Sequence, residues 1–141
     1  MTRIGYGMAV LAVTGGLLAA APSAASAQEK APPGGQYKQV CKLVELPCFL
    51  PGLGDLYVVP STIPAGPWLG YDHDGNLVNT VYMIPIKDMD DHKSFDDLEV
   101  AKGKKVDHVS VLFTPAHPGV AVPHYHIILW YIPPEKVKAL K

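Results

Sequence analysis

Arginine is almost missing from this chain, because Arg3 is the only one. The guanidinium group supplies the planar fork of donors that proteins use to hold phosphates and to recognise base edges. Beyond residue 27 the basic side chains are all lysines, 11 of them (the 12 basic residues less Arg3) against 13 acidic residues. The formal charge of that part is −2, so the composition argues against nucleic-acid binding and against phosphoryl transfer.

Familiar catalytic signatures are missing as well. The chain has no G-x-S-x-G, no H-E-x-x-H and no glycine-rich phosphate loop, and it lacks the C-x-x-C spacing of thioredoxin-like and c-type haem proteins. The acidic stretch "YDHDGN" departs from an EF-hand loop, since Gly75 is its fourth position and Met83 its twelfth. We therefore expect a binding or accessory protein more than an enzyme, and a turn at Asp74-Gly75.

The N-terminal segment 1–27 has the composition of a cleaved signal peptide. Arg3 precedes an apolar run from Ile4 to about Ala21, and Ala25-Ser26-Ala27 is an A-x-A cleavage site. The alternative is a membrane anchor, but the run contains glycines and is short for one. No later stretch is long and apolar enough to predict a stable membrane span. The sequence thus predicts a periplasmic or secreted protein whose mature chain begins near Gln28.

The only two cysteines, Cys41 and Cys48, lie seven positions apart in the predicted mature part. A close, even pair in an oxidising compartment usually forms a disulfide, and we predict that bond here. The alternative is that both thiolates ligate a metal ion.

Proline and β-branched residues dominate the remaining pattern. Residues 28–39 are rich in Pro and Gly and predict a flexible leader, and 40–141 fit one β-rich domain. Frequent prolines disfavour long helices, and "SFDDLEVAK" is either a short helix capped by Ser94 or a solvated connection. We expect a mainly β fold, a small antiparallel barrel or sandwich of five to seven strands with at most one or two short helices. The predicted strands lie within 55–61, 68–86, 104–115 and 123–134.

Histidines concentrate in the last third of the sequence. In a strand, His124 and His126 project to one face about 6.6 Å apart along the chain, near enough to share one ion. If 105–113 and 124–132 form a hairpin, His108 faces the same side, and His117 lies on the connecting loop. Imidazole suits copper and zinc, so we predict a transition-metal site from His124 and His126 with His108 or His117. The alternative is that these side chains only satisfy loop carbonyls.

The stretch "GVAVPHYHIILWYIPPE" resembles the first cupin motif, in which a Gly precedes an H-x-H pair on a barrel strand. Gly119, His124 and His126 match it with one residue fewer after the Gly, while the Glu that should follow is replaced by apolar residues and Glu135 comes too late. The stretch is also similar to P-H-[FY]-D-x-H hairpins of uncharacterised secreted bacterial domains, with His126 in place of the Asp and Ile128 in place of the last His. The cupin resemblance implies a metal-dependent enzyme.

Three functions follow from these observations. The first is an exported β-domain that binds copper or zinc through a histidine cluster in an accessory or binding role. The second is a cupin-like metal-dependent enzyme. The third is a metal-free module whose aromatic residues line a pocket for a small apolar ligand. The partner in the periplasm would be a small molecule or another protein, and the sequence does not predict an oligomeric state.

Overall fold

The computed structural model describes residues 28–141, which form one antiparallel sheet of seven strands. The sheet order is β1-β3-β4-β5-β7-β6, and β2 pairs with β3 beside this path. The prediction of a mainly β, antiparallel fold is confirmed, and the predicted signal peptide lies outside the described residues. The strands are β1 (Lys38–Gln39), β2 (Phe49–Leu50), β3 (Gly54–Val58), β4 (Trp68–Tyr71), β5 (Leu77–Pro85), β6 (His108–Thr114) and β7 (His124–Trp130).

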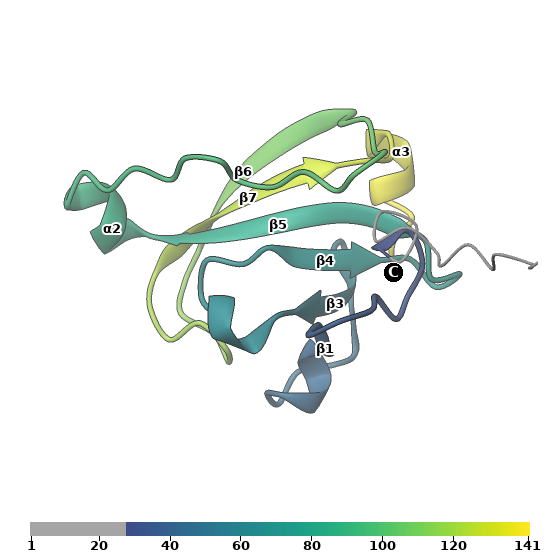
Figure 1. The fold of residues 1–141 in the computed structure, drawn as a ribbon, viewed down its shortest axis with the longest axis horizontal. Helices are drawn as coiled ribbons and strands as arrows, with labels where there is room; N and C mark the ends of the chain where they lie inside the picture. Colours follow the sequence, from purple (N-terminus) through teal and green to yellow (C-terminus); the bar gives the residue numbers. More distant parts are fainter. Residues whose placement is uncertain (1–27) are drawn as a thin grey trace, which may run out of the picture.

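The helices are short and lie at the ends of strands. Helix α2 (Ile86–Asp90) follows β5, α3 (Pro134–Val137) follows β7, and the two lie at opposite ends of the sheet (Figure 1). Two 3-10 turns complete the structure, η1 (Val40–Lys42) and η2 (Pro60–Thr62). The stretch with Ser94 is irregular connection, and Asp97 there has φ 57°, which a right-handed helix does not allow.

The predicted turn at Asp74-Gly75 joins β4 to β5. Gly75 has φ 72°, a value that glycine adopts at little cost. One carboxylate oxygen of Asp72 accepts hydrogen bonds from the backbone N–H groups of Asp74 and Asn76, at 3.0 and 2.8 Å. The Asn76 side-chain amide donates to the same carboxylate. Asp72 therefore stabilises the turn. This role explains the acidic residues of "YDHDGN" without a calcium site.

The inner face of the sheet carries the larger hydrophobic core. Alternate residues of the central strands point there, because side chains in a strand alternate between faces. The segment 44–53 and helix α3 pack against them through partly buried apolar side chains. The buried members of this core are Val40, Leu56, Val58, Trp68, Val78, Val81, Met83, Val120, Ile128, Trp130 and Leu140.

The outer face is covered over part of its area by the connection between α2 and β6. Figure 1 shows this connection running back along the sheet from α2 towards the α3 end. The Tyr82 hydroxyl donates to the Glu99 carbonyl at 2.6 Å, and the Ala101 N–H donates to the Tyr131 hydroxyl at 3.1 Å. The edge strand β6 lies beyond this cover, so Val109, Val111 and Phe113 are more than half exposed.

Residues 28–39, predicted as a flexible leader, lie against the sheet instead. The Tyr71 hydroxyl donates to the Gln28 carbonyl at 2.8 Å, and the Leu77 N–H donates to the Glu29 carbonyl at 3.1 Å. The last two residues of the segment form β1, which pairs with β3. Backbone hydrogen bonds to the β4–β5 turn therefore hold residues 28–39 in place, although their composition predicted flexibility. Within residues 28–141, no helix has the length and apolar character needed to cross a membrane.

Candidate metal centre

His124 and His126 stand on the inner face of β7, as the two-residue spacing predicts. They lie opposite Pro85 and Met83 of β5 on one side. His124 is fully buried and His126 is 7% exposed. The two Nε2 atoms lie 3.0 Å apart. A tetrahedral ion with ligands at about 2.0–2.1 Å spaces its nitrogens about 3.4 Å apart, so these two need only a small separation to share one ion.

His117 joins the pair from the β6–β7 loop. A tight turn brings it there, in which His117 and Val120 exchange two backbone hydrogen bonds of 3.0 Å. Gly119, inside that turn, has φ 90°, a conformation that favours glycine. The His117 ring lies 4.8 Å from the His124 ring and 5.8 Å from the His126 ring, between centroids.

Together the three histidines offer ligand atoms that all lie within 4.8 Å of one another. Ligand nitrogens around a tetrahedral ion are about 3.4 Å apart, so the most distant pair must approach by at most about 1.4 Å. His117 is the part-exposed member and is held by a loop, so it is the residue that can make this movement. The arrangement can hold one transition-metal ion with three imidazoles, which leaves one tetrahedral position for another ligand.

In two of the rings, a backbone carbonyl determines which nitrogen carries the proton. His124 Nδ1 lies 2.7 Å from the Val122 carbonyl oxygen, and His117 Nδ1 lies 2.9 Å from the Pro118 carbonyl oxygen. Since a carbonyl oxygen only accepts, both Nδ1 atoms carry the proton and donate it. The neutral rings then keep their lone pairs on Nε2. This is the outer support that metal-binding histidines usually have, and it orients the ring before any ion arrives.

Burial keeps the inner rings neutral. It lowers the pKa of His126 to about 4, with smaller contributions from His124 and His117 when they are charged. Burial also lowers the pKa of His124, against the opposing effect of its hydrogen bond to the Val122 carbonyl. Because a metal ion needs the lone pair of a neutral imidazole, burial keeps His126 able to bind at pH values below 6.5.

A small apolar cavity adjoins the cluster. Its volume is about 210 Å³, and His117 and His126 contribute to its wall. The other wall residues are Leu46, Leu50, Leu53, Leu56 and Met83. Leucine and methionine side chains make this side of the cluster apolar, which strengthens electrostatic interactions within it.

His108, the other predicted third ligand, is not brought to the cluster. It pairs with Trp130 at the far end of the β6–β7 hairpin, whereas His124 pairs with Thr114. Six residue steps along a strand separate the two positions by about 20 Å. His108 instead stacks on the Trp130 ring at 6.0 Å and hydrogen-bonds Asp107 through Nδ1 at 2.8 Å.

The two cysteines form the predicted disulfide, Cys41–Cys48, so neither sulfur is a thiolate ligand. The bond closes a loop that contains Val44, whose side chain lies beside Gly119 of the β6–β7 loop. Leu46, in the same closed loop, lines the cavity. The disulfide therefore braces the segment that covers the histidine cluster.

The sequence pattern did not predict which residues form the cavity wall. Leu46, Leu50 and Leu53 fall in a proline-interrupted stretch without strand or helix periodicity, so nothing marked them as neighbours of the histidines. Met83 was recognisable only as part of a predicted strand. Its place beside His126 depends on the register of β5 against β7, which one sequence does not supply.

The fold and the site define a class of small antiparallel β-domain with a buried histidine cluster on the inner face of its sheet. No family model and no curated protein matches the chain. Among solved structures, the hypothetical protein TTHB210 from Thermus thermophilus is 41% identical, and the match covers 67% of this chain and 92% of that one with a TM-score of 0.60. The chain therefore belongs to the same family as that Thermus protein.

Proposed function

We propose that this protein is an exported accessory protein that binds a transition-metal ion, copper or zinc, through His117, His124 and His126. One observation carries the proposal: three imidazoles from a strand and a loop converge within 4.8 Å, two of them buried. Three imidazoles at this spacing offer the nitrogen ligands that copper and zinc prefer.

The Nε2 atoms, which point towards one another, favour metal binding over a purely structural role. The Nδ1 atoms of His117 and His124 donate to carbonyls of residues close to them in sequence, which leaves both Nε2 atoms directed elsewhere. These bonds to loop carbonyls are also what the structural alternative predicts, so the distinction depends on the Nε2 atoms. Here the partner of His124 Nε2 is a second histidine, which is the geometry that one ion between the rings would complete.

Export is the second part of the proposal. The Cys41–Cys48 disulfide fits an oxidising compartment, where such bonds persist. The predicted signal peptide in residues 1–27 would direct the chain there. N-terminal sequencing of exported material tests this, and we expect the mature chain to begin at or near Gln28. An intact Met1 in a membrane fraction would contradict it.

The test of metal binding uses untagged protein, because an affinity tag of histidines would bind the same ions. The protein is dialysed against zinc and its metal content is measured, with His117→Ala as the site variant and His108→Ala as the matched control. His117 is suited to this test because it lies on a loop and is not fully buried. We expect about one zinc ion per wild-type and His108→Ala chain, and much weaker binding by His117→Ala. Equal binding by all three proteins would contradict the proposal.

The apolar cavity favours one second candidate, a module that binds a small apolar ligand without metal, although leucine and methionine line the cavity and not the aromatic residues that were predicted. A cavity of about 150 Å³ lined by apolar side chains is large enough for benzene, and this one has about 210 Å³. Benzene added to metal-free protein would then shift the methyl NMR signals of Leu50, Leu53 and Leu56. Such shifts in a protein that takes up no zinc would favour this candidate over the first.

A further inference from the structure

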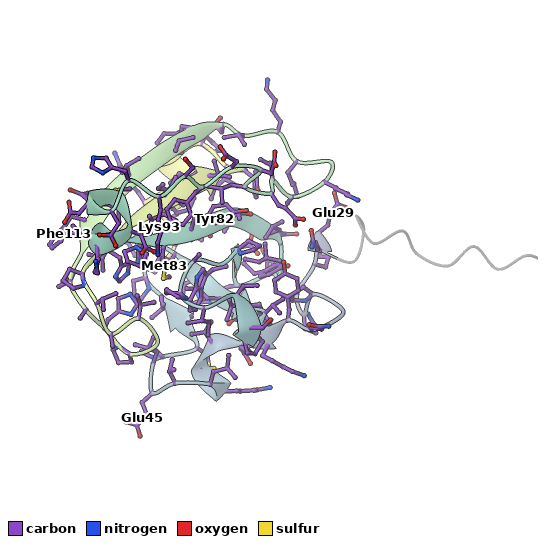
Figure 2. All side chains as sticks on the ribbon, turned by 60° about the vertical axis from the view of Figure 1, so that its left-hand side comes forward. Glu29, Glu45, Tyr82, Met83, Lys93 and Phe113 are labelled. Carbon is purple, nitrogen blue, oxygen red and sulfur yellow. A yellow bond between two sulfur atoms is a disulfide. The ribbon has the colours of Figure 1, made fainter. Side chains whose placement is uncertain are left out.

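Met83 is one of two residues of β5 that pair directly with the histidine cluster, the other being Pro85 opposite His124. Met83 pairs directly with His126 of β7, and directly opposed side chains in a sheet have Cβ atoms about 4.5–5.5 Å apart. Tyr82 and Met83 are adjacent on β5 and lie on opposite sides of the strand (Figure 2). Tyr82 faces the connection to β6, so Met83 is on the inner face with the cluster.

The side chain of Met83 lines the same small cavity as His117 and His126. It is 2% exposed, and its flexible chain ends in a thioether that is a weak, soft donor. Three imidazoles leave one position of a tetrahedral ion open. Because Met83 lines the same cavity as two of the three histidines, its thioether is a candidate for this fourth position.

The charge of the site favours a monovalent ion. All of its donors are neutral, since the cluster consists of three histidines and the two cysteines of the chain are bonded to each other. The cost of bringing an ion into a dry site grows with the square of its charge, so a dication costs about four times as much as a monocation. Zinc sites usually offset this with thiolate or carboxylate ligands or with water, whereas a thioether offers no charge and prefers copper(I).

We propose that Met83 is a fourth ligand and that the site formed by His117, His124, His126 and Met83 selects copper(I) over zinc. This inference rests on the proposed function, because it names the metal of the same histidine cluster. The competing explanation is that Met83 only fills the core, as its packing against Val81 and Ile128 in one cluster allows. A leucine would fill that space equally well but would offer no sulfur.

The test compares Met83→Leu with Met89→Leu, the same substitution at a methionine of α2 that is 41% exposed. Copper(I) affinity is measured under anaerobic ascorbate by competition with bicinchoninate, and zinc affinity by competition with a fluorescent chelator. We expect Met83→Leu to weaken copper(I) binding at least about tenfold and to change zinc binding less than about threefold. Met89→Leu should change neither affinity.

X-ray absorption of the copper(I)-loaded wild-type protein gives a second measurement that needs no variant, should Met83→Leu fold poorly. We expect one sulfur neighbour together with imidazole nitrogens in the first coordination shell. Copper(I) bound by nitrogen alone, or equal copper(I) affinity in wild type and Met83→Leu, would overturn the role of Met83 and leave the histidine site standing. A wild-type protein that binds neither metal would instead overturn the proposed function.

Discussion

The two ends of the β6–β7 hairpin both carry histidine, yet the structure treats them differently. At the turn end, His117, His124 and His126 converge in a largely buried cluster. At the open end, His108 lies beside Asp107 and on the face of the Trp130 ring. Burial in the cluster lowers the pKa of His124 and His126 and so favours their neutral, metal-binding form. The neighbours, not the residue type, decide whether histidine is available to a metal ion.

The largest effect on metal binding should come from His126→Phe at the turn end. Phenylalanine keeps the ring volume in a site that is 7% exposed but removes the nitrogen. We expect zinc affinity to fall at least about 100-fold, since loss of a ligand exceeds the 10–100-fold cost of losing an outer partner. Isothermal titration with zinc measures the loss, and circular dichroism checks the fold. Replacement of His124 and His126 by Ala is a poorer test, because both are buried and truncation would leave a cavity.

A second prediction concerns the acid sensitivity of the metal-free protein. The pKa of His126 is lowered to about 4 by burial, whereas in the unfolded chain it is about 6.5. The unfolded chain therefore takes up the proton first, and the free energy of unfolding falls as the pH drops from about 6.5 to 4. The loss should reach about 3 kcal/mol for this group and not grow further below pH 4.

Urea unfolding at several pH values measures this dependence. His126→Phe should reduce the slope between pH 6.5 and 4, with part of the remainder due to His124, whose pKa is also lowered by burial. The same slope in His126→Phe as in the wild type would show that other groups cause the acid sensitivity.

The third prediction removes the brace over the turn end. Replacing Cys41 and Cys48 by Ser together opens a short loop with a sequence separation of 7 residues. Loop-closure entropy predicts a loss of about 2–3 kcal/mol in the free energy of unfolding. Because that loop lies beside Gly119, we also expect weaker zinc binding. Unchanged zinc affinity would show that the brace supports the fold alone.

The smallest effect should come from the open end. His108→Ala removes a stacking contact and a hydrogen bond to Asp107 in a partly exposed position. We expect a change of less than about 1 kcal/mol in the free energy of unfolding, and none in zinc affinity. Thermal unfolding followed by circular dichroism measures the first quantity. A clear loss of zinc binding would mean that His108 is a ligand, which would contradict the assignment of the site to the turn end of the hairpin.

Local patterns in the sequence were sufficient for the strands β3 to β7 and for the H-x-H pair, but not for the two-residue strands β1 and β2. Alternation along 123–134 predicts that His124 and His126 share a face, and Asp74-Gly75 predicts the β4–β5 turn. The choice between His108 and His117 was beyond such patterns. Both lie close in sequence to the pair, but the register of the hairpin sets His108 opposite Trp130, and a tight turn of the β6–β7 loop returns His117 to the pair.

Segments without periodicity were the least predictable. The cover formed by Leu46, Leu50 and Leu53 depends on a disulfide loop and on contacts made far along the chain. Residues 28–39 were expected to be flexible because of their prolines and glycines, but their order comes from hydrogen bonds to Gly75 and Leu77. In both cases long-range contacts outweigh local composition.

Imidazole NMR can show directly whether the turn end of the hairpin binds a metal ion while the open end does not. Long-range ¹H–¹⁵N spectra of ¹⁵N-histidine protein resolve both ring nitrogens of each residue. On addition of one equivalent of zinc, we predict that the Nε2 signals of His117, His124 and His126 shift together. The Nδ1 atoms of His117 and His124 should stay protonated, and the signals of His108 should not move. Unchanged Nε2 signals at the turn end, or shifts of equal size for His108, would contradict this assignment of the metal site.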